Sequence, residues 1–259
     1  MRRICAGSFV IAAIVLLPAP SRAQVELKVL VGGAMSEPVA EVGDAWARSS
    51  GNRFVYVRDT TGALQKRLAS GEAADVIVLA APGMDALQKD SRIVAGSRTD
   101  LARALIGVAV RAGAPSPDLS TVDTFKAALL KARSVSYVSP AAGGTSGTYI
   151  DGLLRKMGIY DALQSKIVYR TQGSEVADAV ASGEAELGIT FTSELAPNKG
   201  VRVAGTLPAA IQLPTVYVGA LVSTTKNGDA ARAFLRRMAG PEGQAAVKKA
   251  GLDPVGSLR

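Results

Sequence analysis

The stretch TTGALQKRLASGEAADVIVLA, residues 60–80, occurs a second time in altered form as QGSEVADAVASGEAELGITFT, residues 172–192. The two copies align without gaps through a shared ASGEA, at Ala69–Ala73 and Ala181–Ala185, an offset of 112 residues. Each copy predicts a polar turn that caps a helix, followed by a buried strand. The repeat therefore predicts two similar lobes, each of which presents a helix N-terminus to a cleft suited to an anion.

The first 23 residues carry the features of an export signal. Arg2 and Arg3 precede the apolar run Ile4–Leu17, and Ser21-Arg22-Ala23 has the small residues of a cleavage site. The run is too short for a spanning helix. We expect cleavage before Gln24, a periplasmic location and no membrane-spanning segment.

Composition excludes several classes of function. The whole chain has 30 basic and 22 acidic residues, and its basic residues are scattered, so we expect no nucleic-acid partner. It has no histidine, and its one cysteine, Cys5, lies in the signal. The commonest metal ligand and general base are therefore missing, and we expect no metal, no cofactor and no disulfide.

Short β-branched runs alternate with helical patterns along the chain, which predicts an α/β fold with mostly parallel sheets. The apolar runs at 105–110 and 217–221 are interpreted as crossings between lobes. We therefore predict one lobe from residues 24–105 plus 218–259 and a second from residues 106–217, and we expect the protein to be a monomer.

Four loops follow predicted strands and open helices with small or polar residues. Such loops present free backbone N–H groups and hydroxyls to oxyanions at the carboxyl ends of strands. The candidate ligand-binding residues in these loops are Ala34, Ser36, Thr60, Thr61, Thr145, Ser146, Gly173 and Ser174. Gly143–Gly147 lacks the Gly-Lys-Ser/Thr ending of a phosphate-binding loop, so a nucleotide is not implied.

Arg58 and Arg170 occupy equivalent places in the two copies, and each precedes one of these polar turns. A guanidinium there suits bidentate binding of a carboxylate. A solvent-facing strand end or a structural ion pair explains Arg58 as well as ligand binding does, and explains Arg170 slightly better. Two arginines on one ligand would favour a di- or tricarboxylate.

Phrases along the mature chain resemble the periplasmic solute-binding proteins of ABC importers, specifically the molybdate-binding branch of the type II fold. These phrases are LKVLVGGAMSEPV (27–39), the first repeat copy, GTSGTYIDGLLRKMGI (144–159), GEAELGITFTSEL (183–195) and FLRRMAGPEGQAAVKKAGL (234–252). The resemblance implies a two-lobed fold that closes on a small anion and delivers it to an ABC permease.

Residues carried over from that family do not all match. The resemblance places a first-loop serine on Ala34, with Ser36 nearby, and a second-loop serine on Thr61. It places second-lobe donors on Ser146 and near Gly173, and it places a tyrosine on Phe191, which has no hydroxyl. These departures favour a ligand other than molybdate.

The alternative is a periplasmic isomerase similar to aconitate isomerase, built on the same scaffold. Moving a proton next to a carboxylate requires a base. Without histidine or cysteine, the candidates are Asp59, Glu37, Glu194 and Tyr149, none marked by a catalytic spacing. The sequence leaves open whether the protein is an enzyme, which anion it binds and which permease it serves.

Overall fold

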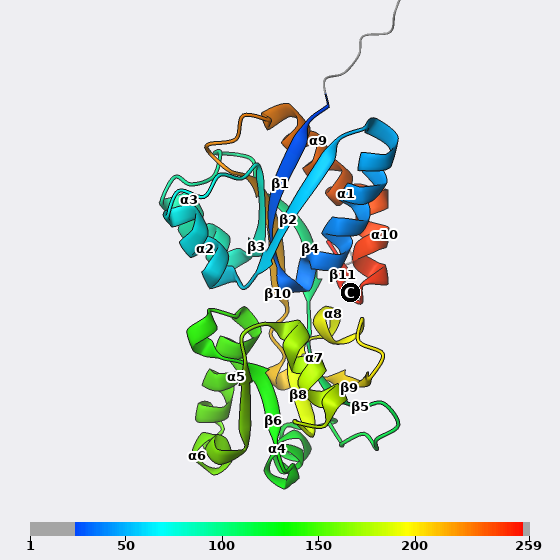
Figure 1. The fold of residues 1–259 in the computed structure, drawn as a ribbon. Helices are drawn as coiled ribbons and strands as arrows, with labels where there is room; N and C mark the ends of the chain where they lie inside the picture. The colour runs from blue at the N-terminus through cyan, green and yellow to red at the C-terminus, as the bar shows by residue number, and fades with distance from the viewer. Residues whose placement is uncertain (1–23, 256–259) are drawn as a thin grey trace, which may run out of the picture.

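A computed structural model describes residues 24–255, so the predicted signal and its cleavage site lie outside the described residues. The chain forms two lobes, each built around one sheet and flanked by helices, stacked one above the other in Figure 1. No helix within residues 24–255 has both the length and the apolar character needed to span a bilayer.

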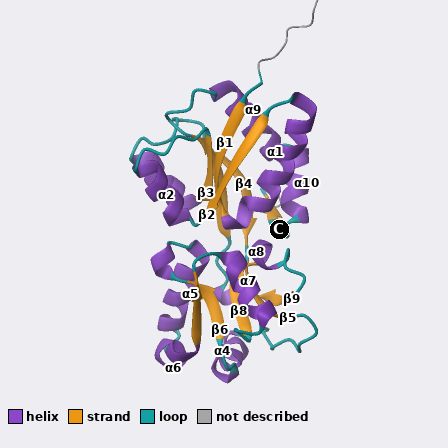
Figure 2. Ribbon diagram, viewed as in Figure 1, coloured by secondary structure: helices purple, strands orange, loops and turns teal. Residues whose placement is uncertain are grey.

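The first sheet has the order β11-β4-β10-β3-β1-β2. Its strands are β1 (Glu26–Gly32), β2 (Arg53–Asp59), β3 (Val76–Ala80), β4 (Thr99–Ala104), β10 (Thr215–Leu221) and β11 (Asp253–Pro254). Helices α1 (Ser36–Ser50), α9 (Gly228–Ala239) and α10 (Pro241–Lys249) pack together on one face, while α2 (Thr61–Ala69) and α3 (Ala81–Lys89) cover the other (Figure 2).

The second sheet has the order β7-β6-β8-β5-β9. Its strands are β5 (Ile106–Arg111), β6 (Val135–Val138), β7 (Ile167–Arg170), β8 (Leu187–Phe191) and β9 (Val201–Thr206). The helices of this lobe are α4 (Val122–Lys131), α5 (Thr145–Lys156), α6 (Tyr160–Leu163), α7 (Gly173–Ser182) and α8 (Thr192–Leu195). Short 3-10 turns are η1 (Gly33–Met35), η2 (Pro140–Ala142), η3 (Gln164–Lys166) and η4 (Ala209–Ile211).

Both sheets are mixed rather than mostly parallel. In each, three neighbouring strands are parallel. β10 then pairs antiparallel with both β3 and β4, and β5 pairs antiparallel with both β8 and β9. β4 ends at Ala104 and β5 begins at Ile106, so the chain crosses to the second sheet there. It returns through residues 207–214, whose Gln212 side chain exchanges two hydrogen bonds with the Ile106 backbone, at 3.2 and 2.8 Å. The two crossings are thereby tied together.

The two copies of the repeat form the same unit, β2-α2-β3 in one lobe and β7-α7-β8 in the other, with β2 and β7 at equivalent edges of their sheets. Backbone conformation explains why both copies contain the glycine of ASGEA. Gly71 and Gly183 follow the two helices with φ of 89° and 85°, the left-handed conformation that ends helices and that glycine adopts without strain.

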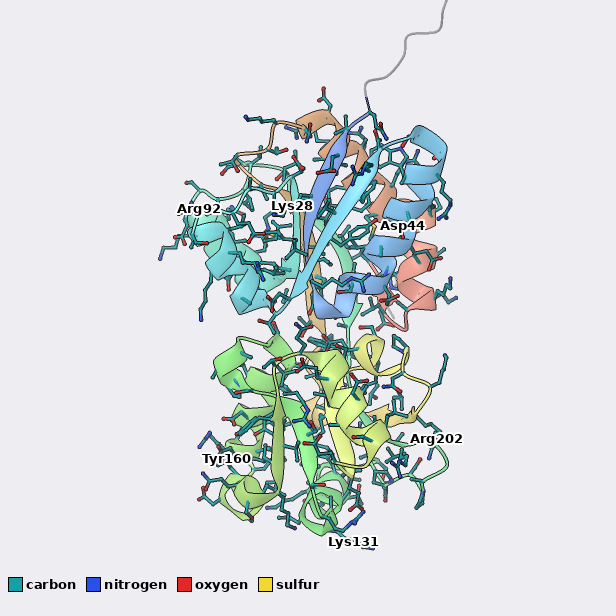
Figure 3. All side chains as sticks on the ribbon, viewed as in Figure 1. Lys28, Asp44, Arg92, Lys131, Tyr160 and Arg202 are labelled. Carbon is teal, nitrogen blue, oxygen red and sulfur yellow. The ribbon has the colours of Figure 1, made fainter. Side chains whose placement is uncertain are left out.

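Charged side chains are spread over both lobes. Figure 3 shows Lys28 and Arg92 on the first lobe and Lys131 and Arg202 at separate points of the second. Such spacing matches the scattered basic residues of the sequence.

Close packing around α5 gives a test of this fold. A Cβ added at Gly147 would overlap the carbonyl oxygen and carbon of Val138, whereas a Cβ at Gly152, on the exposed side of the same helix, meets nothing within 4 Å. We expect Gly147→Ala to lower the free energy of unfolding by about 2–3 kcal/mol, because backbone cannot move aside. Gly152→Ala should be neutral or stabilise by up to about 1 kcal/mol. Urea unfolding of both variants checks the difference; equal effects would contradict this packing.

Candidate functional site

A cavity of about 360 Å³ lies between the lobes, at the carboxyl ends of parallel strands from both sheets. The segments that follow β1, β2, β6, β7 and β8 all contribute to its wall. In the second lobe, two of the longer helices begin at this wall: α5 at Thr145 and α7 at Gly173. Free N–H groups at such ends favour negatively charged ligands.

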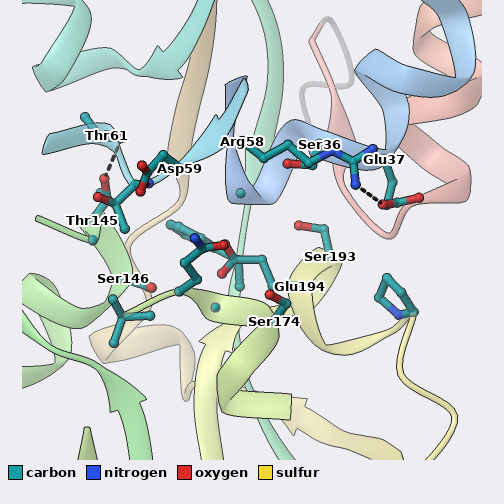
Figure 4. A pocket seen from close by; sticks show the side chains of 18 of the residues that line it. Ser36, Glu37, Arg58, Asp59, Thr61, Thr145, Ser146, Ser174, Ser193 and Glu194 are labelled. Carbon is teal, nitrogen blue, oxygen red and sulfur yellow. Dashed lines mark hydrogen bonds and ion pairs between the residues drawn. The ribbon is translucent and has the colours of Figure 1, made fainter. Parts of the chain in front are cut away.

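Most of the residues selected from the sequence line this cavity (Figure 4). Those that do are Ser36, Arg58, Thr60, Thr61, Thr145, Ser146, Gly173 and Ser174. Ala34 and Arg170 are not among the lining residues. The η1 turn directs Ala34 into the core of the first lobe, where it is 1% exposed, and leaves Gly33 at the cavity.

The two equivalent arginines have different environments. Arg58 lines the cavity and forms a partly exposed ion pair with Glu37, with Nη1 and Oε1 3.4 Å apart. Arg170 forms an ion pair with Glu184, just after α7, and donates to the Tyr169 carbonyl. The structure therefore does not bring both guanidinium groups to one ligand, because the edge position of β7 allows Arg170 to turn away from the cleft.

Threonine side chains join the lobes across the cleft. The Thr60 hydroxyl donates to the Ala142 carbonyl at 2.6 Å, and the Thr145 hydroxyl donates to that of Thr61 at 3.3 Å. Beside them the Gly62 amide donates to the Gly143 carbonyl at 3.1 Å. Glycine at both positions permits this approach, since a Cβ on either would lie about 3 Å from the other's Cα. The lobes are therefore in direct contact, and these hydroxyls bind protein atoms.

Glu194 is the carboxylate most enclosed by the two lobes. Its Oε2 accepts a 2.5 Å hydrogen bond from Thr190, whose hydroxyl also bonds that of Ser146 at 3.0 Å. Its carboxyl lies so close to Gly33 of the first lobe and Gly173 of the second that a Cβ on either would overlap it. Burial raises the pKa of Glu194 from its usual 4.5 to about 7, although the Thr190 hydrogen bond favours the ionised form.

Ser193 and Tyr217 complete this wall of the cavity. Ser193 is 4% exposed, and its hydroxyl is the buried side-chain group in residues 24–255 that has no hydrogen-bond partner. Tyr217 packs edge-on against Phe191, with ring centroids 5.8 Å apart. Burial and the nearby Glu194 raise the pKa of Tyr217 well above its usual value.

Sequence reasoning named Glu194 only as one of four candidate bases and missed Ser193 and Tyr217. Of the other candidates, Glu37 and Asp59 line the cavity, whereas Tyr149 lies elsewhere and donates to the Ile211 carbonyl at 2.7 Å. The one available signal was the position of Ser193 and Glu194 immediately after the second repeat copy, at the carboxyl end of a buried strand.

The raised pKa of Glu194 has a consequence for stability. The folded state holds this proton more tightly than the unfolded chain, so stability falls as pH rises from about 4.5 to about 7. We expect Glu194→Gln to match the wild type near pH 4.5 and to exceed its free energy of unfolding by about 2–3 kcal/mol at pH 8. Urea unfolding across this range measures the difference. A gap that does not change with pH would contradict the assigned environment.

Comparison with known proteins agrees with this architecture. The chain is 35% identical to the aconitate isomerase of a Pseudomonas species over 88% of each chain. It is 26% identical to the molybdate-binding protein ModA of Azotobacter vinelandii, over 87% of this chain and 89% of the relative. The solved structure of the periplasmic molybdate-binding protein from that organism superimposes with a TM-score of 0.72 and 22% identity, covering 87% of this chain and 98% of that one. The model of the bacterial extracellular solute-binding protein family matches residues 27–253, and the chain belongs to that family.

Proposed function

We propose that this protein is the periplasmic solute-binding component of an ABC importer and that it closes its lobes on a small organic acid anion. The observation that carries the proposal is the interlobe cavity itself, where two helix N-termini and the unpartnered Ser193 hydroxyl lie together. These are neutral donors, which bind an oxyanion without a fixed positive charge.

The size of the cavity supports a carboxylic acid of several carbons. About 360 Å³ lies within the range of sites that hold whole small molecules and is generous for a compact four-oxygen ion. Loss of the serine hydroxyl at Ala34 and of the tyrosine hydroxyl at Phe191 removes two donors that the resemblance associates with molybdate. The ligand named for the ModA relatives is therefore the weaker choice here.

Lobe closure would couple binding to transport. The crossings at Leu105 and at residues 207–214 are the natural hinges, and the closed pair of lobes would form the surface that a permease recognises. The export signal expected from the sequence would place such a protein outside the cytoplasmic membrane.

Ser193 gives a direct test of the binding site. Ser193→Ala removes a buried hydroxyl that has no partner, so the unfolding free energy of the free protein should not fall. Affinity for the bound anion should weaken by about 1–3 kcal/mol, because a hydrogen bond to a charged ligand is lost.

Calorimetry with trans-aconitate, tricarballylate, succinate, sulfate and molybdate on the mature protein identifies the ligand class and measures the change. Ser70→Ala, which removes an exposed hydroxyl just after α2 that donates to the Arg67 carbonyl, is the matched control. Tight molybdate binding without carboxylate binding would overturn the ligand class, and an unaltered affinity in Ser193→Ala would remove this residue from the site.

A second candidate function is isomerisation of a tricarboxylate. Glu194 supplies the specific observation, because a cleft carboxyl with a pKa of about 7 is suited to accept and return a proton at neutral pH. The named activity of the 35% identical relative supports it independently. The ionised Glu194 would take a proton from the methylene next to a carboxylate and return it to the far carbon of the allylic anion, so that the double bond moves and no atom is gained or lost.

Proton NMR in D₂O separates the two functions. An isomerase should convert trans-aconitate and exchange its methylene protons for deuterium, and Glu194→Gln should abolish both. Asp178→Asn, which removes another carboxylate from the cavity wall, should retain turnover. Binding of trans-aconitate without exchange over hours would exclude the isomerase and leave the transport function.

A further inference from the structure

The position of Glu194 conflicts with anion binding if its carboxyl is ionised. The carboxyl lies between Gly33 and Gly173, at the point where the two lobes meet around the cavity. An anion held at the N-terminus of α7 would lie close to it. Two negative groups in a partly desolvated site repel each other strongly.

No cation offsets this charge. Within residues 24–255, Glu194 takes part in no ion pair, and the basic side chain that lines the cavity, Arg58, is paired with Glu37. The other titratable or charged groups that face the cavity are Glu37 of α1, Asp59 of β2, Asp178 of α7 and Tyr217 of β10. Acidic side chains therefore outnumber basic ones around the ligand space.

Protonation of Glu194 would reverse its effect on an anion. Oε2 accepts the Thr190 hydrogen bond, so a proton on Oε1 would leave that bond in place. A protonated carboxyl is a hydrogen-bond donor, and donors to ionised acceptors are among the stronger hydrogen bonds in proteins. The same side chain that repels an anion when ionised would bind it when neutral.

We propose that Glu194 binds the ligand as a carboxylic acid, so that the cleft takes up one proton with each anion that it captures. This inference rests on the proposed function and adds a specificity-determining residue to it. It makes capture of the anion pH-dependent without histidine, which the chain lacks.

In the free cleft, Glu194 changes its protonation state near neutral pH. Burial raises the pKa of Glu194 to about 7, against the opposing effect of the Thr190 hydrogen bond. A bound anion would raise that pKa further, because it disfavours a second negative charge. The pKa of Tyr217 is raised as well, so its phenol stays neutral in the same range.

Calorimetry tests the inference by counting protons. Sulfate, which is fully ionised throughout, is titrated into the mature protein at pH 6, 7 and 8, and trans-aconitate is titrated at pH 7 and 8, where its third carboxyl is ionised as well. Each titration is repeated in two amine buffers of different ionisation enthalpy, since the difference in binding heat gives the number of protons taken up. We expect about 0.1 proton at pH 6 and about 0.9 at pH 8, with the dissociation constant rising about fivefold from pH 7 to pH 8.

Glu194→Gln provides the decisive variant, because glutamine keeps the shape and a donor but does not titrate. Its binding should take up no proton, and at pH 8 it should bind the anion more tightly than the wild type. Glu41→Gln is the matched control, because Glu41 is an exposed carboxylate of α1 that pairs with Lys249 and does not line the cavity; its proton uptake should equal that of the wild type. Thermal unfolding of each variant confirms that it is folded. Proton uptake by the wild type alone already tests the inference if a variant does not fold.

Three results would overturn the inference. Wild-type binding with no proton uptake at pH 8 would show that Glu194 is not protonated in the complex. Proton uptake that persists in Glu194→Gln would assign it to another group. Wild-type affinity that increases with pH, together with loss of binding in Glu194→Gln, would show that Glu194 is ionised in the complex and accepts a hydrogen bond from the ligand. Absence of binding by any probe at any pH is a different result, and it would remove the proposed function itself.

Discussion

Close contact between the backbones of the two lobes is the constraint on which the cleft depends. Gly62 and Gly143 meet with an amide-to-carbonyl hydrogen bond, and neither position has room for a Cβ without a shift of the other backbone. The Thr60 hydroxyl strengthens this junction by donating to the Ala142 carbonyl. Because the loops that make the contact also begin α2 and lead into α5, lobe closure and the shape of the ligand site are fixed together.

The same junction suits the proposed anion site, whose donors are neutral. Bringing two lobes together desolvates what lies between them, and an unpaired charge there is costly. Hydroxyls and helix N-termini avoid that cost, whereas the charged groups of Arg58 and Glu37 remain partly exposed as a pair. Glu194 is the exception. Its position beside Gly33 and Gly173 raises its pKa to about 7, so both its neutral and its ionised form are populated near neutral pH.

The protonation state of Glu194 links the two functions proposed for this cleft. A carboxyl that is neutral in the complex donates to an anion and favours capture and release. One that is ionised in the complex accepts a proton from carbon and favours isomerisation. The relatives include proteins named for both roles. Under these two proposals, the protonation state of the half-buried Glu194 in the complex distinguishes a carrier from an enzyme.

The sequence by itself determined the α/β character, the duplicated unit and eight of the residues that line the cavity. Each rests on local chemistry: the ASGEA glycines end both helices, and small or polar residues after strands make good helix starts. Other elements were not predicted. Helix α3 begins at Ala81-Pro82-Gly83, which has the composition of a turn, and β4 has the polar sequence TDLARA and is a strand because β10 pairs with it.

Only the tertiary structure decided which side chains share the cleft. The repeat predicted the same ligand-binding role for Arg58 and Arg170. Arg170, however, lies on an edge strand, where it forms an ion pair with Glu184 outside the cavity. Ser193 and Glu194 carry no motif; burial and the approach of the opposite lobe give them their importance. A pattern along the chain records which residues can cap or pair locally, whereas desolvation by a distant segment is a property of the folded molecule alone.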